Sequence, residues 1–274
     1  MKRIKLFLLL IILSLTLSGC DWTDIFQKQP CTKEECLVYE TDEITQLILD
    51  TSEQIRESNI HIKKTVYEKN ALGGPRLYAA SSAEGSGFVF YSDQDYYYAL
   101  TNFHVVDIEI SQNRLYSVEY EITVNYTSIK TNVSVVAQGD NIYDIAVLRF
   151  PKNDLQIPLM PLTPRLESQA ILNEFILIVG NPGGQINVVS TSKVISICRC
   201  LSGIPYNVLY FEYNMKSPGN SGGAVTDING NVLGMITWQN PENFKRKFAI
   251  PIAQIVAFLE NNQIPYQINT ENNT

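Results

Sequence analysis

The stretch PKNDLQIPLMPLTP, residues 151–164, divides the chain into two parts of similar character. Proline fixes the backbone φ angle and has no N–H to donate, so this density of prolines favours an extended connector. On both sides of the stretch, short runs rich in β-branched and aromatic residues are separated by Gly, Asn, Asp or Ser, a pattern that predicts β-strands. The runs lie near residues 60–67, 86–91, 96–100, 115–126, 130–137 and 145–150, and then near 174–180, 187–199, 207–214, 223–227, 232–238 and 246–250. Two such sets around a proline-rich link indicate a two-barrel all-β protein.

Helices are expected at the two ends of this β region. Apolar residues recur at helical spacing within residues 41–56, where Thr41 or Asp42 is a candidate N-cap, and residues 252–260 have a helical pattern as well. The polar residues 21–40 predict an irregular tether. The expected organisation is a signal peptide (1–19), a tether with an amphipathic helix (20–57), an N-terminal β-barrel (58–151), a linker (152–170), a C-terminal β-barrel (171–250), and a C-terminal helix with a polar tail (251–274).

The N-terminus has the features of an export signal. A basic start is followed by the apolar residues 6–17 and then by Leu17-Ser18-Gly19-Cys20. The apolar run is shorter than the roughly 20 residues that a spanning helix needs. The ending resembles the bacterial lipobox, which implies that Cys20 is acylated and becomes the mature N-terminus; an ordinary signal peptide with an incidental cysteine is the alternative. We therefore expect a lipoprotein, palmitate included, anchored to the extracytoplasmic face of the cell membrane.

Charge and cysteine content narrow the function further. The formal net charge is −7, and loss of the three basic residues in 1–19 would make it −10, which argues against nucleic-acid binding. An exported location permits disulfides: Cys31 and Cys36 would close a small loop, while Cys198 and Cys200 share one strand face, and the sequence does not settle their pairing. Neither spacing is typical of zinc, so no metal and no cofactor are expected.

The stretch SPGNSGG, residues 217–223, places Ser221 among glycines. A serine hydroxyl becomes a useful nucleophile when a base takes its proton and fixed donors hold the developing oxyanion. Glycine permits the backbone geometry that aims the amides of Gly219 and Ser221 at one point. A Gly/Asn-rich hairpin turn would explain the same residues.

His104 and Asp144 are the candidate base and orienting acid. His104 lies in a predicted tight turn after a strand, and the chain has only two histidines from which to choose a general base. Asp144 opens a buried-looking strand, where a carboxylate beside an imidazole would fix the tautomer of the ring. Taken alone, the histidine would be read as structural and the aspartate as a cap or turn residue.

Four segments in order now point to a family: GSGFV (85–89), TNFHVV (101–106), DIAVL (144–148) and SPGNSGG (217–223). Together they resemble the HtrA/Deg branch of trypsin-like serine peptidases, over roughly residues 58–260.

The resemblance implies two perpendicular, antiparallel six-stranded β-barrels of the chymotrypsin type, with the active site in the cleft between them. It also implies that His104, Asp144 and Ser221 form the catalytic triad, and that the Gly219 and Ser221 amides form the oxyanion hole.

The same resemblance also implies how substrate is bound. The segment GMITW, residues 234–238, resembles the strand that pairs with the substrate backbone. Thr237 would hydrogen-bond Asp144 and Trp238 would wall the specificity pocket, with core packing as the alternative. Met215 falls at the floor of that pocket, where an apolar side chain would favour small or aliphatic substrate residues over Lys or Arg.

Two departures from the family limit the inference. Asn220 stands where digestive trypsin-like enzymes have an aspartate that pairs with the freed N-terminus, so we expect activity to depend on the loops 182–187 and 200–207, with an imperfect oxyanion hole at rest. The residues after Ile250 are too few for the PDZ domain that many HtrA-like proteins carry, so its regulation and oligomers are not assumed.

The expected function is therefore an extracytoplasmic serine endopeptidase that acts on protein or peptide substrates, unfolded chains among them, through an acyl-enzyme on Ser221. The alternative is a catalytically weak surface-binding or chaperone-like protein that keeps the peptidase fold.

Overall fold

The computed structural model describes residues 31–69, 76–108, 116–213 and 218–267. The chain divides into two units, Met1–Gln46 and Leu47–Thr274, of which the described residues of the first are helical. The catalytic candidates all belong to the second unit. Met215 and Cys20 lie outside the described residues.

Helix α3 (Cys31–Arg56) begins earlier than the apolar spacing predicts, so Cys31 and Cys36 lie in a helix and not in an irregular tether. In its last turns Ile55 is fully buried, while Leu47 and Leu49 are exposed. The Thr51 hydroxyl donates to the carbonyl oxygen of Ile228 over 2.8 Å, a contact within the second unit that fixes the end of the helix to the turn before β12.

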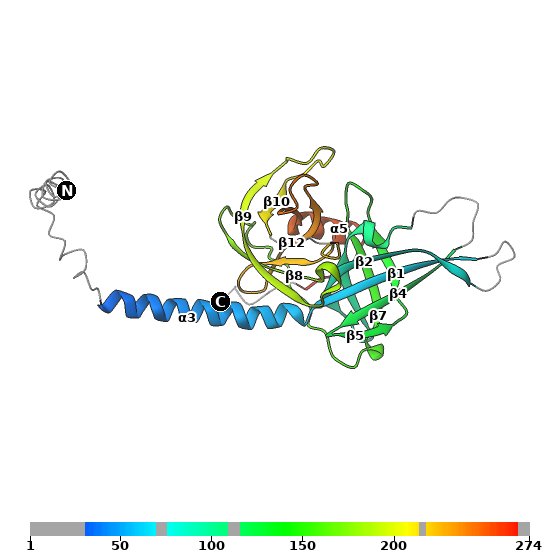
Figure 1. The fold of residues 1–274 in the computed structure, drawn as a ribbon, viewed down its shortest axis with the longest axis horizontal. Coiled ribbons are helices and arrows are strands. Elements are labelled where there is room, and N and C mark those ends of the chain that lie inside the picture. Colours follow the sequence, from blue (N-terminus) through cyan, green and yellow to red (C-terminus); the bar gives the residue numbers. More distant parts are fainter. Residues whose placement is uncertain (1–30, 70–75, 109–115, 214–217, 268–274) are drawn as a thin grey trace, which may run out of the picture. The chain divides into compact units, whose positions relative to one another are not determined.

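The N-terminal half is one antiparallel sheet of seven strands in the order β5-β4-β1-β2-β3-β7-β6 (Figure 1). The strands are β1 (Asn59–Lys69), β2 (Arg76–Ser92), β3 (Tyr96–Thr101), β4 (Tyr116–Val124), β5 (Thr127–Lys130), β6 (Ser134–Gln138) and β7 (Ala146–Pro151). Ile60, Ile62, Val89, Ala99 and Leu148 are buried together on it. A short helix, α4 (Phe103–Val106), follows β3.

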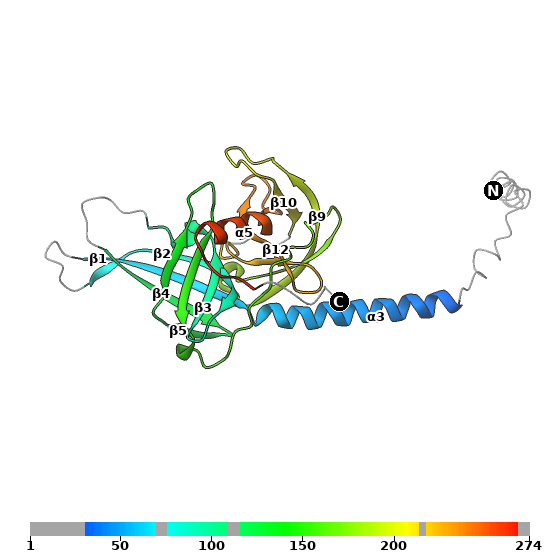
Figure 2. The ribbon, with the colours of Figure 1, turned by 180° about the vertical axis from the view of Figure 1, so that it is seen from behind.

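The C-terminal half is a closed barrel in the order β10-β13-β12-β11-β8-β9. Its strands are β8 (Phe175–Gly180), β9 (Val188–Cys198), β10 (Val208–Glu212), β11 (Ala224–Thr226), β12 (Val232–Gln239) and β13 (Arg246–Pro251), and two short 3₁₀ turns lie at Lys152–Asp154 and Pro182–Gly184. Helix α5 (Ile252–Asn261) packs against β12 and β13 through Ile252, Ile255 and Leu259 (Figure 2).

The proline-rich connector is hydrogen-bonded to both halves. Leu162 N donates to the carbonyl of Val89 over 2.9 Å, and Val232 N donates to that of Thr163 over 2.8 Å. Leu159 and Leu162 are buried. The connector begins with the 3₁₀ turn Lys152–Asp154, where proline content predicts an extended chain, and its later residues join the two halves.

The all-β, double-barrel fold with helices at its ends is confirmed. The first half differs in detail, because Asn125 and Tyr126 both have positive φ, 45° and 66°, and join β4 to β5 in a two-residue hairpin. Positive φ at both central positions is the geometry of a type I′ turn, whose right-handed twist suits a hairpin. That turn adds a strand that the sequence pattern does not predict.

Cys198 and Cys200 form a disulfide across a single intervening residue. Within the described parts of the chain, His, Cys, Asp and Glu side chains form no cluster able to hold a metal ion. In the same parts of the chain, no helix is both long and apolar enough to cross a membrane.

Candidate active site

His104 and Asp144 are brought together by the register of two strands. Strand β3 pairs antiparallel with β7 so that Thr101 lies opposite Ala146. The residues just after β3 therefore lie beside the residue just before β7, which places His104 in α4 next to Asp144.

The pair is joined by two hydrogen bonds. His104 Nδ1 lies 2.8 Å from Asp144 Oδ2, and the backbone N–H of His104 donates to Asp144 Oδ1 over 3.0 Å. Asp144 is 3% exposed, whereas the His104 side chain is 47% exposed. With Nδ1–H directed at the carboxylate, Nε2 is the ring nitrogen that can accept a proton, and the buried carboxylate can stabilise the imidazolium that results.

Two further residues hold Asp144 in place. The Thr237 hydroxyl, from β12 in the other barrel, donates to Asp144 Oδ2. The Asn102 side-chain amide donates to the backbone carbonyl of Asp144 over 2.8 Å. Asp144 is therefore fixed through its side chain and its main chain, by residues from both halves of the molecule.

Tyr206 packs over the same loop and is a residue that sequence analysis missed. Its ring lies 5.7 Å from that of Tyr143, and its hydroxyl donates to the carbonyl of Ile142 over 3.0 Å. Burial, followed by the negative charge of Asp144, raises the pKa of Tyr206, so its hydroxyl stays protonated.

Ser221 lies in the loop before β11 and is held against β2. Its carbonyl oxygen accepts a hydrogen bond of 2.8 Å from Ser86 N, and the next amide, Gly222 N, donates to Ile236 O over 2.9 Å. Gly222 has φ of +89°, and a Cβ there would overlap the Ser86 carbonyl oxygen. Glycine is thus required at this position by both conformation and space.

Strand β2 also touches the histidine side of the site. A Cβ on Gly85 would lie 2.6 Å from Val105 Cγ2 and 3.3 Å from the carbonyl oxygen of Ser221. Gly85 therefore lets α4 and the Ser221 loop approach one strand residue together. Among the described residues, the hydrogen bonds of this region join His104 to Asp144, and none links the Ser221 hydroxyl to the imidazole.

The peptide between Pro218 and Gly219 is held in one orientation. The Pro218 carbonyl oxygen accepts a hydrogen bond of 2.7 Å from Gly183 N, within the 182–187 loop. In a trans peptide the C=O and the following N–H point in opposite directions, so the Gly219 N–H points away from Gly183. Gly219 has φ of +104°, a conformation that favours glycine.

Buried side chains below Gly219 form a connected network that the motifs do not reveal. The Ser86 hydroxyl donates to the Gly219 carbonyl over 2.6 Å and accepts a hydrogen bond of 2.8 Å from Asn181 N. Asn181 Oδ1 in turn accepts from Asn59 Nδ2 over 2.9 Å and from Asn187 N over 3.0 Å. All five residues are buried or nearly so, and the network links the start of β1 to the Gly219 peptide.

A cavity of about 260 Å³ opens beside Ser221. Its walls include Thr237 and Trp238, together with Gln239 and Lys247. The remaining lining residues are Pro218, Asn220 and Ile236.

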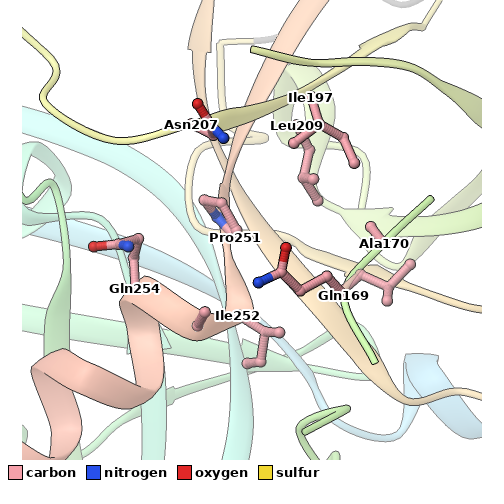
Figure 3. Close-up of a pocket in the computed structure, with 10 residues that line it drawn as sticks. Gln169, Ala170, Ile197, Asn207, Leu209, Pro251, Ile252 and Gln254 are labelled. Carbon is pink, nitrogen blue, oxygen red and sulfur yellow. The ribbon is translucent and has the colours of Figure 1, made fainter. Parts of the chain in front are cut away.

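A second, smaller cavity of about 150 Å³ lies at the beginning of α5 (Figure 3). It is lined by Gln169 and Ala170 of the connector, by the strand residues Ile197 and Leu209, and by Gln254 of the helix, among others. Among the residues that the structure describes, the two cavities share no lining residue, and the second is lined by no acid, base or nucleophile of the kind that the first site has.

Comparison with known proteins gives a consistent assignment. The family model described as "trypsin-like peptidase domain" matches residues 85–235. Two curated relatives are both described as "Serine protease HtrA-like" and come from Staphylococcus aureus strains bovine RF122 and USA300. The first is 28% identical over 225 residues and the second 27% over 221, and each alignment covers 73% of this chain and 27% of the relative. The chain thus spans about a quarter of the length of these relatives.

Solved structures show the same fold at low identity. The active form of the Rv3671c protease from M. tuberculosis superposes with a TM-score of 0.56 and 20% identity, over 80% of this chain and 87% of that one. The inactive form gives a TM-score of 0.52 and 18% identity, over 77% of this chain and 92% of the other.

Proposed function

Because the chain belongs to the trypsin-like peptidase domain family, we propose that it is a serine endopeptidase of the HtrA/Deg type, with His104, Asp144 and Ser221 as its catalytic residues. Its substrates are proteins and peptides, including unfolded chains. The observation that carries the proposal is the hydrogen bond of 2.8 Å between His104 Nδ1 and the buried Asp144 carboxylate.

In the proposed mechanism, the Ser221 hydroxyl oxygen attacks the substrate carbonyl carbon while its proton passes to His104 Nε2. The Gly219 and Ser221 amides stabilise the oxyanion, and Asp144 stabilises the imidazolium. When the C–N bond breaks, His104 returns the proton to the departing amine and leaves an acyl ester on Ser221. A water molecule, deprotonated by His104, then hydrolyses the ester and restores the serine.

In this mechanism the Ser221 hydroxyl and His104 Nε2 must come within hydrogen-bonding distance of each other. Catalytic hydrogen bonds are often long in a substrate-free enzyme and shorten in the Michaelis complex. The orientation of the Pro218–Gly219 peptide favours a Gly219 N–H that is already free for an oxyanion, so the need for an activating loop movement is smaller than the sequence alone suggests.

The mechanism is tested with the full chain and with Ser221→Ala. The wild type should cleave casein and should be labelled by a fluorophosphonate probe, and Ser221→Ala should lose both activities. Loss of a triad member costs orders of magnitude in rate, so casein cleavage that persists in Ser221→Ala would contradict the mechanism. Casein binding without cleavage or labelling by the wild type would instead favour the surface-binding alternative.

We further propose that the protein is a lipoprotein on the extracytoplasmic face of the cell membrane, anchored through Cys20. The support is the sequence of residues 1–20. Globomycin, which blocks lipoprotein signal peptidase, should leave an unprocessed precursor of higher mass, and a Cys20→Ala variant should no longer incorporate labelled palmitate. Unchanged processing in the presence of globomycin would contradict the anchor.

A further inference from the structure

The end of helix α3 is hydrogen-bonded to the loop that holds the Pro218 carbonyl. Arg56, the last residue of the helix, donates from Nε to the carbonyl oxygen of Asn187 over 3.2 Å. The two residues are 131 positions apart in the chain, so folding alone brings them together. The proposed mechanism makes no use of this contact.

The helix end from which Arg56 extends is itself held in place. Ile55 is fully buried in a hydrophobic core that also contains residues of the C-terminal barrel. The Ser58 hydroxyl, just after the helix, donates to the carbonyl oxygen of Ile55 over 2.8 Å, and Thr51 is bonded to Ile228 one turn earlier. The half-buried Arg56 side chain therefore reaches the loop from a fixed part of the molecule.

Asn187 receives this contact, and all four of its polar groups have partners. Its side-chain oxygen accepts from Asn59 Nδ2 over 2.6 Å, and its side-chain amide donates to Asn125 Oδ1 over 2.8 Å. Its backbone N–H donates to Asn181 Oδ1, and its carbonyl accepts from Arg56. Asn187 is 7% exposed and has φ of +58°, a left-handed conformation that asparagine tolerates better than most residues. These contacts fix the loop where β9 begins.

The tip of the same loop is open to solvent. Gly183, Gly184 and Gln185 are exposed, and a Cβ on either glycine would meet nothing within 4 Å. The tip nevertheless reaches the active site, because Gly183 N donates to the Pro218 carbonyl oxygen over 2.7 Å. Since side-chain packing does not hold the tip, its position depends on the buried residues at the two ends of the loop.

The orientation of the Pro218–Gly219 peptide decides whether its N–H can serve an oxyanion. Rotation of this peptide by about 180° would break the hydrogen bond from Gly183 and turn the Gly219 N–H toward the loop. Loss of one oxyanion-hole donor costs roughly 10²–10³-fold in kcat. A change that loosens the loop should therefore lower kcat without touching the substrate.

We propose that the end of α3 maintains the oxyanion hole, with Arg56 as a positioning residue that keeps the 182–187 loop bonded to the Pro218 carbonyl. The inference rests on the proposed function for its effect on catalysis. For the coupling between helix and loop, it rests on the contacts alone.

Arg56→Met and Arg56→Gln isolate the hydrogen bond. Glutamine places an N–H donor as many bonds from the backbone as arginine Nε, whereas methionine has a similar length and no donor. With a quenched fluorescent, casein-derived peptide, Arg56→Met should lower kcat by about tenfold and leave KM little changed, because the oxyanion hole acts in the transition state. Arg56→Gln should recover most of the wild-type kcat.

Gln54→Met changes an exposed residue of the same helix and should keep the wild-type kcat. Full kcat in Arg56→Met would overturn the proposal, and so would a loss that Arg56→Gln does not restore. Asn187→Gly is the second variant if Arg56→Met does not fold. It permits the positive φ but removes the side-chain bonds to Asn59 and Asn125, so it should also lower kcat at a similar KM. An unchanged kcat in Asn187→Gly would likewise overturn the proposal.

Hydrogen–deuterium exchange separates this inference from the proposed function. It is measured in Ser221→Ala, to prevent self-digestion, with and without Arg56→Met. Amides of residues 182–187 should exchange about tenfold faster when Arg56 is replaced, while those of β3 and β7 keep their protection. If the wild type cleaves no peptide and this difference is present, the proposed function fails while the coupling stands. Unchanged exchange in the loop would refute the coupling whether or not the chain is a peptidase.

Discussion

Asp144 is hydrogen-bonded to both halves of the molecule. Its carboxylate accepts hydrogen bonds from the backbone N–H and the imidazole of His104 in the first half, and from the hydroxyl of Thr237 in the second. Each donor removes part of the desolvation cost of a buried negative charge. The same donors restrict the carboxylate to one orientation, which sets the plane of the imidazole.

Thr237→Val tests the contribution of the donor from the second half. Valine keeps the shape of threonine but leaves one lone pair of a buried carboxylate without its partner, so kcat/KM should fall by about tenfold, in line with a hydrogen bond to a charged group. Kinetics on casein-derived peptides would measure the change. Thr191→Val, at an exposed position on β9, is the matched control and should leave kcat/KM unaltered. Full activity of Thr237→Val would mean that His104 and Asn102 are sufficient to hold Asp144.

At the scale of elements, the loop around Gly219 is supported from below by strand ends. Ser86 of β2 holds the Gly219 carbonyl, and Asn181 connects Ser86 to Asn59 at the start of β1. Buried amide networks are stabilising when every member has a partner and costly when one is removed. The geometry of the oxyanion loop is therefore linked to the packing of β1 against the C-terminal barrel.

Asn181→Ala should break this support. It removes the side-chain hydrogen bonds of Asn181 to Ser86, Asn59 and Asn187, so the free energy of unfolding should fall by about 1–3 kcal/mol or more, the cost of leaving buried polar groups unpaired. Urea denaturation followed by fluorescence would measure it. The rate of fluorophosphonate labelling in the folded protein should also decrease, because the Ser86 hydroxyl that holds the Gly219 carbonyl loses one of its two donors. Asn229→Ala, at an exposed turn position, is the control for both measurements. Stability lost without any change in labelling rate would show that the network supports the fold alone.

Some elements were accessible from the sequence and others were not, for identifiable reasons. The segments that contain His104, Asp144 and Ser221 can be recognised from their neighbouring residues in the sequence, because each needs a glycine or a strand end at a fixed position. The Ser86–Asn181–Asn59 network has no such signal, because its members are distant in the chain and each has an ordinary polar side chain. Only the GSG segment around Ser86 and the Asn-Pro-Gly-Gly segment that begins at Asn181 hint at unusual backbone there.

The same reasoning applies to the elements that differ from expectation. The β4–β5 hairpin uses Asn-Tyr at positions of positive φ, where Asn-Gly would have been recognised. Lys247 is buried although it is charged, and alternation along β13 does not tell which face of a barrel strand is covered, because tertiary packing decides that question.

At the scale of the whole molecule, the sequence predicts the fold well because the connector is so distinct. Prolines interrupt the β pattern once, between two sets of strands, and the structure has its sheet and its barrel on the two sides of that interruption. The curvature of the sheet and the closure of the barrel depend on bulges and on pairing across distant strands, such as β10 with β13, which local patterns do not specify.

The connector has a consequence for how activity could be assembled. His104 and Asp144 lie before it and Ser221 lies after it, and its residues 156–158 are exposed. If the chain were produced as two polypeptides, one ending and the other beginning within residues 156–158, each would lack part of the proposed catalytic triad. Peptide hydrolysis would then appear only upon mixing, with a rate that rises with the concentration of both pieces. The rate of peptide hydrolysis would then measure how much of the two pieces has associated.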